Sequence, residues 1–152
     1  MHNPLLPFSL LLKRGLLAIC LAVLVNGVIY LLVTRGALVE PFGALTPPPV
    51  IFLTIFGTIA ATTVYGAITR ISPYPDRVFV ALAGVALLLS FIPNVIVLVA
   101  DPEATPGAVL VLMSMHVTVA FLCVYSVTDS YSPLTRSPEQ PAQQQDNEES
   151  TG

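Results

Sequence analysis

Charged residues are scarce in this chain of 152 residues, at 10%, whereas 55% are hydrophobic. A water-soluble domain carries about a quarter charged residues, so this composition argues against an ordinary soluble fold. Four stretches contain no charge at all, at 15–34, 41–69, 78–100 and 104–128. Each can supply the roughly 20 apolar residues with which a helix crosses a hydrocarbon core of about 30 Å. The scarcity of charge therefore predicts four membrane spans.

Cysteine is also rare. Cys20 and Cys123 lie inside apolar stretches without CxxC spacing, so we interpret them as small buried side chains rather than a redox pair. The first uncharged stretch, 15–34, is longer than the roughly 7–15 apolar residues of a secretory signal, which favours a retained helix. The net charge of −3 leaves no basic surface for nucleic acid.

The sequence predicts an all-α, integral membrane, up-and-down four-helix bundle. A basic leader, 1–14, precedes a transmembrane domain, 15–131, with spans at about 15–34, 50–69, 77–100 and 107–128. The acidic tail, 132–152, is predicted to be disordered, because its Ser, Pro, Gln, Asp and Glu residues bury too little apolar surface to fold.

Prolines and capping residues set the expected helix ends. Each proline pushes the residue before it toward extended backbone, so Pro49, the last of three, is the predicted first helical residue of span two. Asp76 is predicted to cap span three, and Thr105 to cap span four with Pro106 at its first position. Pro93 inside span three is expected to bend that helix.

Lysine and arginine are distributed unequally around the spans. One side of the membrane has Lys13, Arg14, Arg70, Arg77 and Arg136, and the other has Arg35 alone. Because cytoplasmic flanks are enriched in these residues, both termini are predicted to be cytoplasmic. We expect a multi-pass protein of the cell (plasma) membrane, with the lipid bilayer as its surroundings.

Span two has one face of small and hydroxyl-bearing residues. At helical spacing this face contains Thr54, Gly57, Thr58, Ala61, Thr62 and Tyr65, whereas Phe52, Ile55, Phe56 and Ile59 lie opposite. Helices in lipid associate through small residues and polar contacts, so the first set is predicted to face the bundle and the second to face lipid.

Five polar residues are predicted to form a layer near the middle of the membrane: Asn26, Thr58, Ser90, Asn94 and His116. Asn26 and His116 lie at a similar depth, about 13 Å from the outer ends of their spans at helical rise. His116 has two interpretations. It is either a neutral side chain hydrogen-bonded to a Thr, Ser or Asn of a neighbouring helix, or a proton-sensitive or ligand-binding group. The pattern does not decide which face of span four is inward.

Catalytic, metal and cofactor sites are not predicted. The spans contain no Asp or Glu, no second histidine that could hold a haem, and no nucleotide-binding or nucleophile motif. We therefore expect no enzyme. The first functional hypothesis is a membrane protein that acts through helix–helix association, as a homo-oligomer or as a subunit of a membrane complex. The alternative is a small-solute or ion carrier or channel with its polar layer around His116 and Asn94.

Short motifs resemble those of a known family. The run Leu45-Thr46-Pro47-Pro48-Pro49, the pairs Leu89-Ser90 and Pro93-Asn94, and the pair Met115-His116 together resemble a prokaryotic family of small four-helix membrane proteins, domain of unknown function 6069. The resemblance covers roughly residues 10–130 and implies the architecture but no activity. It draws attention to the proline loop, Ser90, Pro93 and His116. The residue after the span-three proline is often acidic in that family, and Asn94 at this position weakens any cation-binding role.

Overall fold

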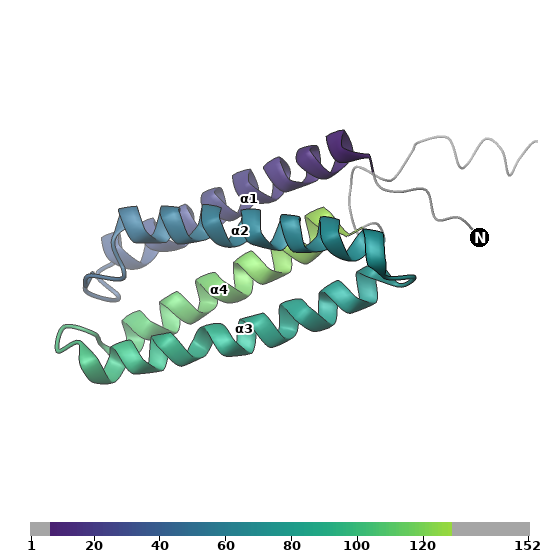
Figure 1. Cartoon of the computed structure of the whole chain (residues 1–152). Coiled ribbons are helices and arrows are strands. Elements are labelled where there is room, and N and C mark those ends of the chain that lie inside the picture. Colours follow the sequence, from purple (N-terminus) through teal and green to yellow (C-terminus); the bar gives the residue numbers. More distant parts are fainter. Residues whose placement is uncertain (1–6, 129–152) are drawn as a thin grey trace, which may run out of the picture.

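The computed structural model describes residues 7–128, which form four long helices joined by short links (Figure 1). These are α1 (Phe8–Arg35), α2 (Pro47–Ile71), α3 (Pro75–Ala100) and α4 (Pro106–Val127). All four are long and apolar enough to cross a membrane. The prediction of an all-α bundle of four helices is confirmed, and each helix qualifies as a membrane span by its length and composition. Residues 1–6 of the predicted leader and the predicted tail, 132–152, lie outside the described residues.

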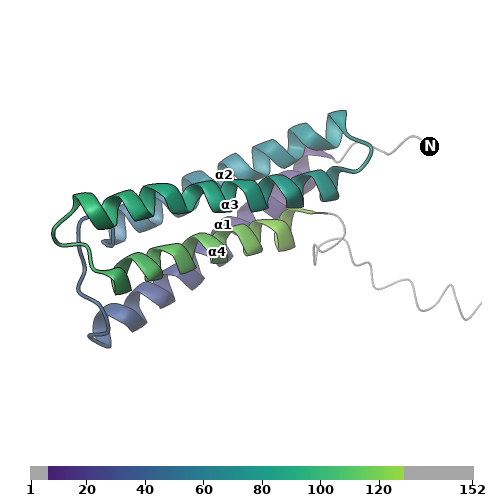
Figure 2. The same cartoon turned by 90° about the horizontal axis from the view of Figure 1, so that it is seen from below.

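The helices form a bundle in which α2 and α3 pack less closely than the other neighbouring helices. α1 packs against α2 and α4, and α3 packs mainly against α4, whereas α2 and α3 contact each other less (Figures 1 and 2). The start of α1 and the end of α4 lie at the same end of the bundle. One buried hydrophobic cluster includes Phe42, Leu45 and Leu112, and a second includes Tyr65 and Phe79.

The first turn of α2 accommodates all three consecutive prolines. The helix begins at Pro47 with Thr46 as its N-cap, so the prediction that Pro49 is the first helical residue was wrong. The first N–H groups of a helix have no partner within it, and their absence from proline costs nothing there. Val50, the first residue after the prolines, donates its N–H to the Thr46 carbonyl at 3.2 Å, which is the helical spacing of four residues.

Helix α1 begins at Phe8, ahead of the predicted span, and includes both basic residues of the predicted leader. Lys13 is exposed, but Arg14 is completely buried and donates from Nη1 to the carbonyl oxygen of Val127 at 3.1 Å. The last carbonyls of a helix have no partner within it and carry partial negative charge, so a cation is favourable at this end of α4. Arg14 therefore joins the two terminal helices.

Of the caps predicted for the N-terminal ends of α3 and α4, the one for α4 was right and the one for α3 was wrong. As predicted, α4 begins at Pro106, and the Thr105 side chain accepts a hydrogen bond from the backbone N–H of Ala108 at 3.2 Å. Asp76 does not cap α3. The helix begins at Pro75, and Asp76 in its first turn accepts a hydrogen bond from the Tyr65 hydroxyl at 2.7 Å.

The small and hydroxyl-bearing face of α2 is buried or half-buried, in part against α1. Thr54, Thr58 and Tyr65 are buried, while Gly57, Ala61 and Thr62 are half-buried. The two helices approach each other closely at Gly15 of α1, where an added Cβ would lie 2.8 Å from Cγ2 of Thr62. Only glycine fits here without displacing the neighbouring helix.

Candidate intramembrane binding site

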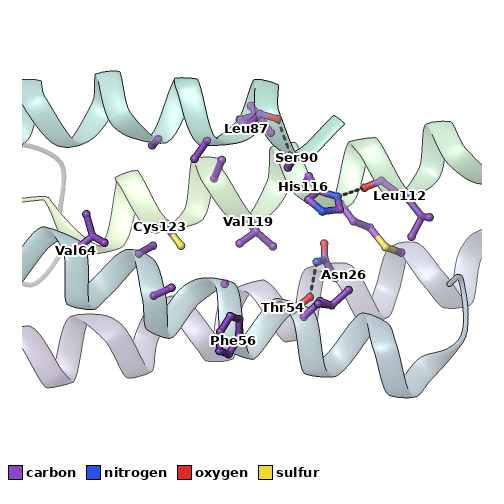
Figure 3. A pocket seen from close by; sticks show the side chains of 18 of the residues that line it. Asn26, Thr54, Phe56, Val64, Leu87, Ser90, Leu112, His116, Val119 and Cys123 are labelled. Carbon is purple, nitrogen blue, oxygen red and sulfur yellow. Dashed lines mark hydrogen bonds between the residues drawn. The ribbon is translucent and has the colours of Figure 1, made fainter. Parts of the chain in front are cut away.

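A pocket of about 430 Å³ lies between α2, α3 and α4, with Asn26 of α1 at its inner wall (Figure 3). This volume lies within the usual range for sites that bind small molecules. Most of the lining is apolar. The polar or sulfur-bearing side chains that line it are Asn26, Thr54, Ser90, Met115, His116 and Cys123.

Small side chains on α2 and α3 create the space. The pocket is lined by Gly57, Ala60 and Ala61 of α2 and by Ala83 and Ala86 of α3. A Cβ added at Gly57 would meet no atom within 4 Å. The small size of these lining residues therefore explains why α2 and α3 pack less closely.

The pocket opens sideways, toward the lipid. Phe56 of α2 and Leu82 of α3 both line it, and their side chains are 62% and 46% exposed. In a helix that crosses a membrane, exposed apolar side chains at this depth face hydrocarbon. A lipid-soluble molecule could reach the pocket laterally without crossing the membrane surface.

Asn26 presents an unsatisfied oxygen to this space. Its side chain is only 2% exposed, and its Nδ2 donates a hydrogen bond to Oγ1 of Thr54 at 3.0 Å. Among the described residues, none provides a partner for the buried Oδ1. Figure 3 shows this oxygen pointing across the pocket toward the ring of His116. A buried carbonyl oxygen without a partner is costly, so a donor from a bound molecule would stabilise it.

His116 adds a second acceptor. Its Nδ1 lies 2.7 Å from the carbonyl oxygen of Leu112, one turn earlier in α4. A carbonyl can only accept, so Nδ1 carries the hydrogen, and in the neutral ring Nε2 is then an acceptor. The histidine is thus held by its own helix and not by a Thr, Ser or Asn of a neighbouring helix, which was one of the two interpretations of the sequence.

The five residues of the predicted polar layer do not share one surface. Asn26, Ser90 and His116 line the pocket, and Thr58 and Asn94 do not. The Ser90 hydroxyl donates to the Leu87 carbonyl at 2.6 Å, and the Thr58 hydroxyl donates to the Thr54 carbonyl at 2.7 Å. Asn94 is buried, and its Nδ2 has no partner within residues 7–128.

Two contributors to the pocket were not predicted as part of it. Thr54 was assigned only to the packing face of span two, but its hydroxyl orients the Asn26 amide. Cys123, interpreted as a buried hydrophobic residue, lines the pocket two turns after His116 on the same face of α4. The seven-residue spacing of His116 and Cys123 was a usable signal, because residues so spaced share a helix face.

Asn26 and His116 offer hydrogen-bond acceptors to the pocket in apolar surroundings. No Asp, Glu, Lys or Arg is present among the described residues that line it. Within residues 7–128, no group of three or more His, Cys, Asp and Glu side chains is arranged to hold a metal ion. The arrangement of Asn26 and His116 can orient a bound molecule through its donors.

Comparison with known proteins gives a family and no further relative. Residues 8–132 match a family of unknown function, DUF6069, which confirms the resemblance seen in the sequence motifs. No curated protein and no solved structure matches the chain.

Proposed function

We propose that this chain, which belongs to the family of unknown function DUF6069, binds a small lipid-soluble molecule in the pocket between α2, α3 and α4. The molecule enters sideways from the bilayer, through the opening bordered by Phe56 and Leu82. The proposed role is binding or carriage without catalysis. It narrows the alternative of a small-solute carrier to solutes that partition into the membrane.

One observation supports the proposal above all others. The Oδ1 atom of Asn26 is buried without a partner among the described residues and points into a pocket of about 430 Å³. An acceptor in apolar surroundings is costly to leave unsatisfied, whereas a purely structural asparagine normally uses both ends of its amide. The atom is placed as expected of a group that orients a ligand.

Helix–helix association has less support from the geometry. The association hypothesis depends on the face of α2 that contains Thr54, Thr58 and Thr62. Thr54 is hydrogen-bonded to Asn26 of α1, and Thr62 packs against Gly15 of α1. These residues are occupied within the chain, so they offer little to a second copy or to another protein.

The proposal also specifies the membrane and the orientation of the chain in it. We propose that the chain crosses the plasma membrane four times with both termini in the cytoplasm. Lys13, Arg70 and Arg77 lie at the end of the bundle where α1 starts, and Arg35 lies at the opposite end. Under the positive-inside rule the first end is cytoplasmic.

Fluorescence quenching tests for the site, because the chain contains no tryptophan. Leu82→Trp places a reporter at the mouth of the pocket. Val80→Trp is the matched control, since Val80 is similarly exposed (43%) but does not line the pocket. In proteoliposomes, 11-bromoundecan-1-ol should quench Leu82→Trp along a saturable curve, whereas quenching of Val80→Trp should rise in proportion to the probe in the bilayer.

A second pair of variants separates the pocket from the membrane around it. Gly57→Leu adds a side chain to the open space of the pocket, and Gly84→Leu adds the same side chain on α3 outside it; a Cβ at either position meets nothing within 4 Å. Gly57→Leu should remove the saturable component and Gly84→Leu should preserve it. Linear quenching at Leu82→Trp would refute the proposal.

A further inference from the structure

We infer that the pocket selects its ligand by a neutral hydroxyl group, and that the ligand is a lipid-soluble alcohol or phenol rather than its ether or ketone counterpart. This inference rests on the proposed function, since it specifies the ligand of the same pocket. It follows from the hydrogen-bonding state of the two polar residues that face each other there, Asn26 and His116.

Both residues present acceptors to the pocket. The Nδ2 donor of Asn26 is used by Thr54, and the Nδ1 hydrogen of His116 is used by the Leu112 carbonyl. What remains is the Oδ1 atom of Asn26 and the Nε2 atom of His116, and neither can donate to the other while the ring is neutral. A hydroxyl group in this space can donate its hydrogen to one of these two acceptors. An ether or ketone oxygen would leave both unsatisfied.

Two hydroxyl side chains line the pocket, Thr54 and Ser90, and neither donates to these two acceptors among the described residues. Ser90 donates to the carbonyl of Leu87 within α3. Thr54 accepts the Asn26 amide hydrogen at its Oγ1, and Oδ1 of Asn26 has no partner among the described residues. The acceptors of Asn26 and His116 therefore remain available to a bound molecule.

The charge of the lining favours a neutral donor over an ammonium group. Among the described residues, none that lines the pocket is an Asp or Glu, so an alkylammonium ion would be taken out of water without a counter-charge. A hydroxyl group carries no such penalty. Its apolar chain would lie along the small residues of α2 and α3, toward Leu82.

Three probes with the same chain test this inference in the Leu82→Trp protein. They are 11-bromoundecan-1-ol, its methyl ether and 11-bromoundecylamine, each compared at equal concentration in the bilayer. The alcohol should reach half-saturation at a concentration about tenfold lower than the ether, because the ether leaves buried acceptors without a donor. The amine should bind more weakly than the alcohol.

The variants His116→Phe and Asn26→Leu should reduce the preference for the alcohol over the ether. Of the two, His116→Phe leaves the hydrogen bond from Asn26 to Thr54 in place. The three-probe comparison needs neither variant, so it stands even if one of them fails to fold. Equal saturable binding of alcohol and ether would overturn the hydroxyl selection and leave the proposed function intact. Tighter binding of the amine would overturn the assignment to a neutral group. Linear quenching by all three probes would refute the proposed function itself.

Discussion

The approach of α1 to α2 at Gly15 gives a prediction that can be worked out atom by atom. Replacing Gly15 by alanine would place a Cβ 2.8 Å from Cγ2 and 3.2 Å from Oγ1 of Thr62. Carbon atoms in ordinary contact are at least about 3.5 Å apart, so the new methyl group is about 0.7 Å too close. Thr62 cannot easily turn away, because its hydroxyl donates to the Thr58 carbonyl at 2.8 Å. The helices must therefore separate.

The expected cost follows from this overlap and from a control on the same helix. Overpacking of this kind lowers the free energy of unfolding by about 1–3 kcal/mol. Gly27→Ala is the matched control, because its Cβ meets nothing within 4 Å and reports only the intrinsic effect of alanine in a helix. Thr62→Ala removes both of the closest atoms and leaves the Thr62 Cβ at 3.4 Å, so the double variant with Gly15→Ala should regain most of the loss.

The assay is reversible unfolding in mixed micelles, titrated with SDS and followed by far-UV circular dichroism. The unaltered protein is compared with four variants, which are Gly15→Ala, Gly27→Ala, Thr62→Ala and the double variant that combines Gly15→Ala with Thr62→Ala. If Gly15→Ala were as stable as Gly27→Ala, or if Thr62→Ala gave no rescue, the helices would not cross at this point and the reasoning would be refuted.

Other predictions test the ends of the bundle. Arg14→Ala removes the buried donor to the last turn of α4 and should lower the free energy of unfolding by about 1–3 kcal/mol, while Lys13→Ala at the exposed neighbour should change it by less than about 0.5 kcal/mol. Tyr65→Phe removes the hydroxyl that bonds the carboxylate at the start of α3 and should cost about 1–3 kcal/mol in the same assay, against almost nothing for Tyr74→Phe, whose ring is exposed. A green fluorescent protein fused after Gly152 should fluoresce in cells and an alkaline phosphatase fused there should be inactive; the reverse pattern would contradict the proposed orientation.

The membrane helices could be predicted from the sequence because their signal is local. A long stretch without charge identifies a span by itself, and no knowledge of the neighbouring helices is needed. The exposure of Phe52, Phe56 and Ile59 on α2 likewise corresponds to a pattern within one helix. The prediction missed the start of α2 at Pro47 because two effects of proline oppose each other there. Proline disfavours helical backbone at the residue before it, but the first turn of a helix does not need its N–H groups.

The candidate site could be predicted only in part, because it depends on how the helices are rotated against one another. The depths of Asn26 and His116 follow from residue counts, but the bond from Asn26 to Thr54 depends on the packing of α1 against α2. Span four carries polar residues on two sides, and only the packed bundle shows that Leu112 and Cys123 are buried while Ser114 is exposed. The bond from His116 to the carbonyl of its own helix is local, and the spacing of four residues could have indicated it.

The burial of Arg14 illustrates the same limit for charges. Next to an apolar stretch, a cation is normally read as a surface residue, and the sequence alone gave no reason to distinguish Arg14 from Lys13. The distinction arises because the C-terminal end of α4 lies beside this turn of α1. Only the folded arrangement supplies the acceptor.

The central claim is that the pocket between α2, α3 and α4 holds a lipid-soluble molecule. The most direct measurement is native mass spectrometry of the protein purified from its membrane in mild detergent, with Gly57→Leu and Gly84→Leu purified in parallel. A bound small molecule that carries a hydroxyl group should accompany the unaltered protein and Gly84→Leu, and should be absent from Gly57→Leu. The same adducts in all three proteins, or none in any of them, would contradict the claim.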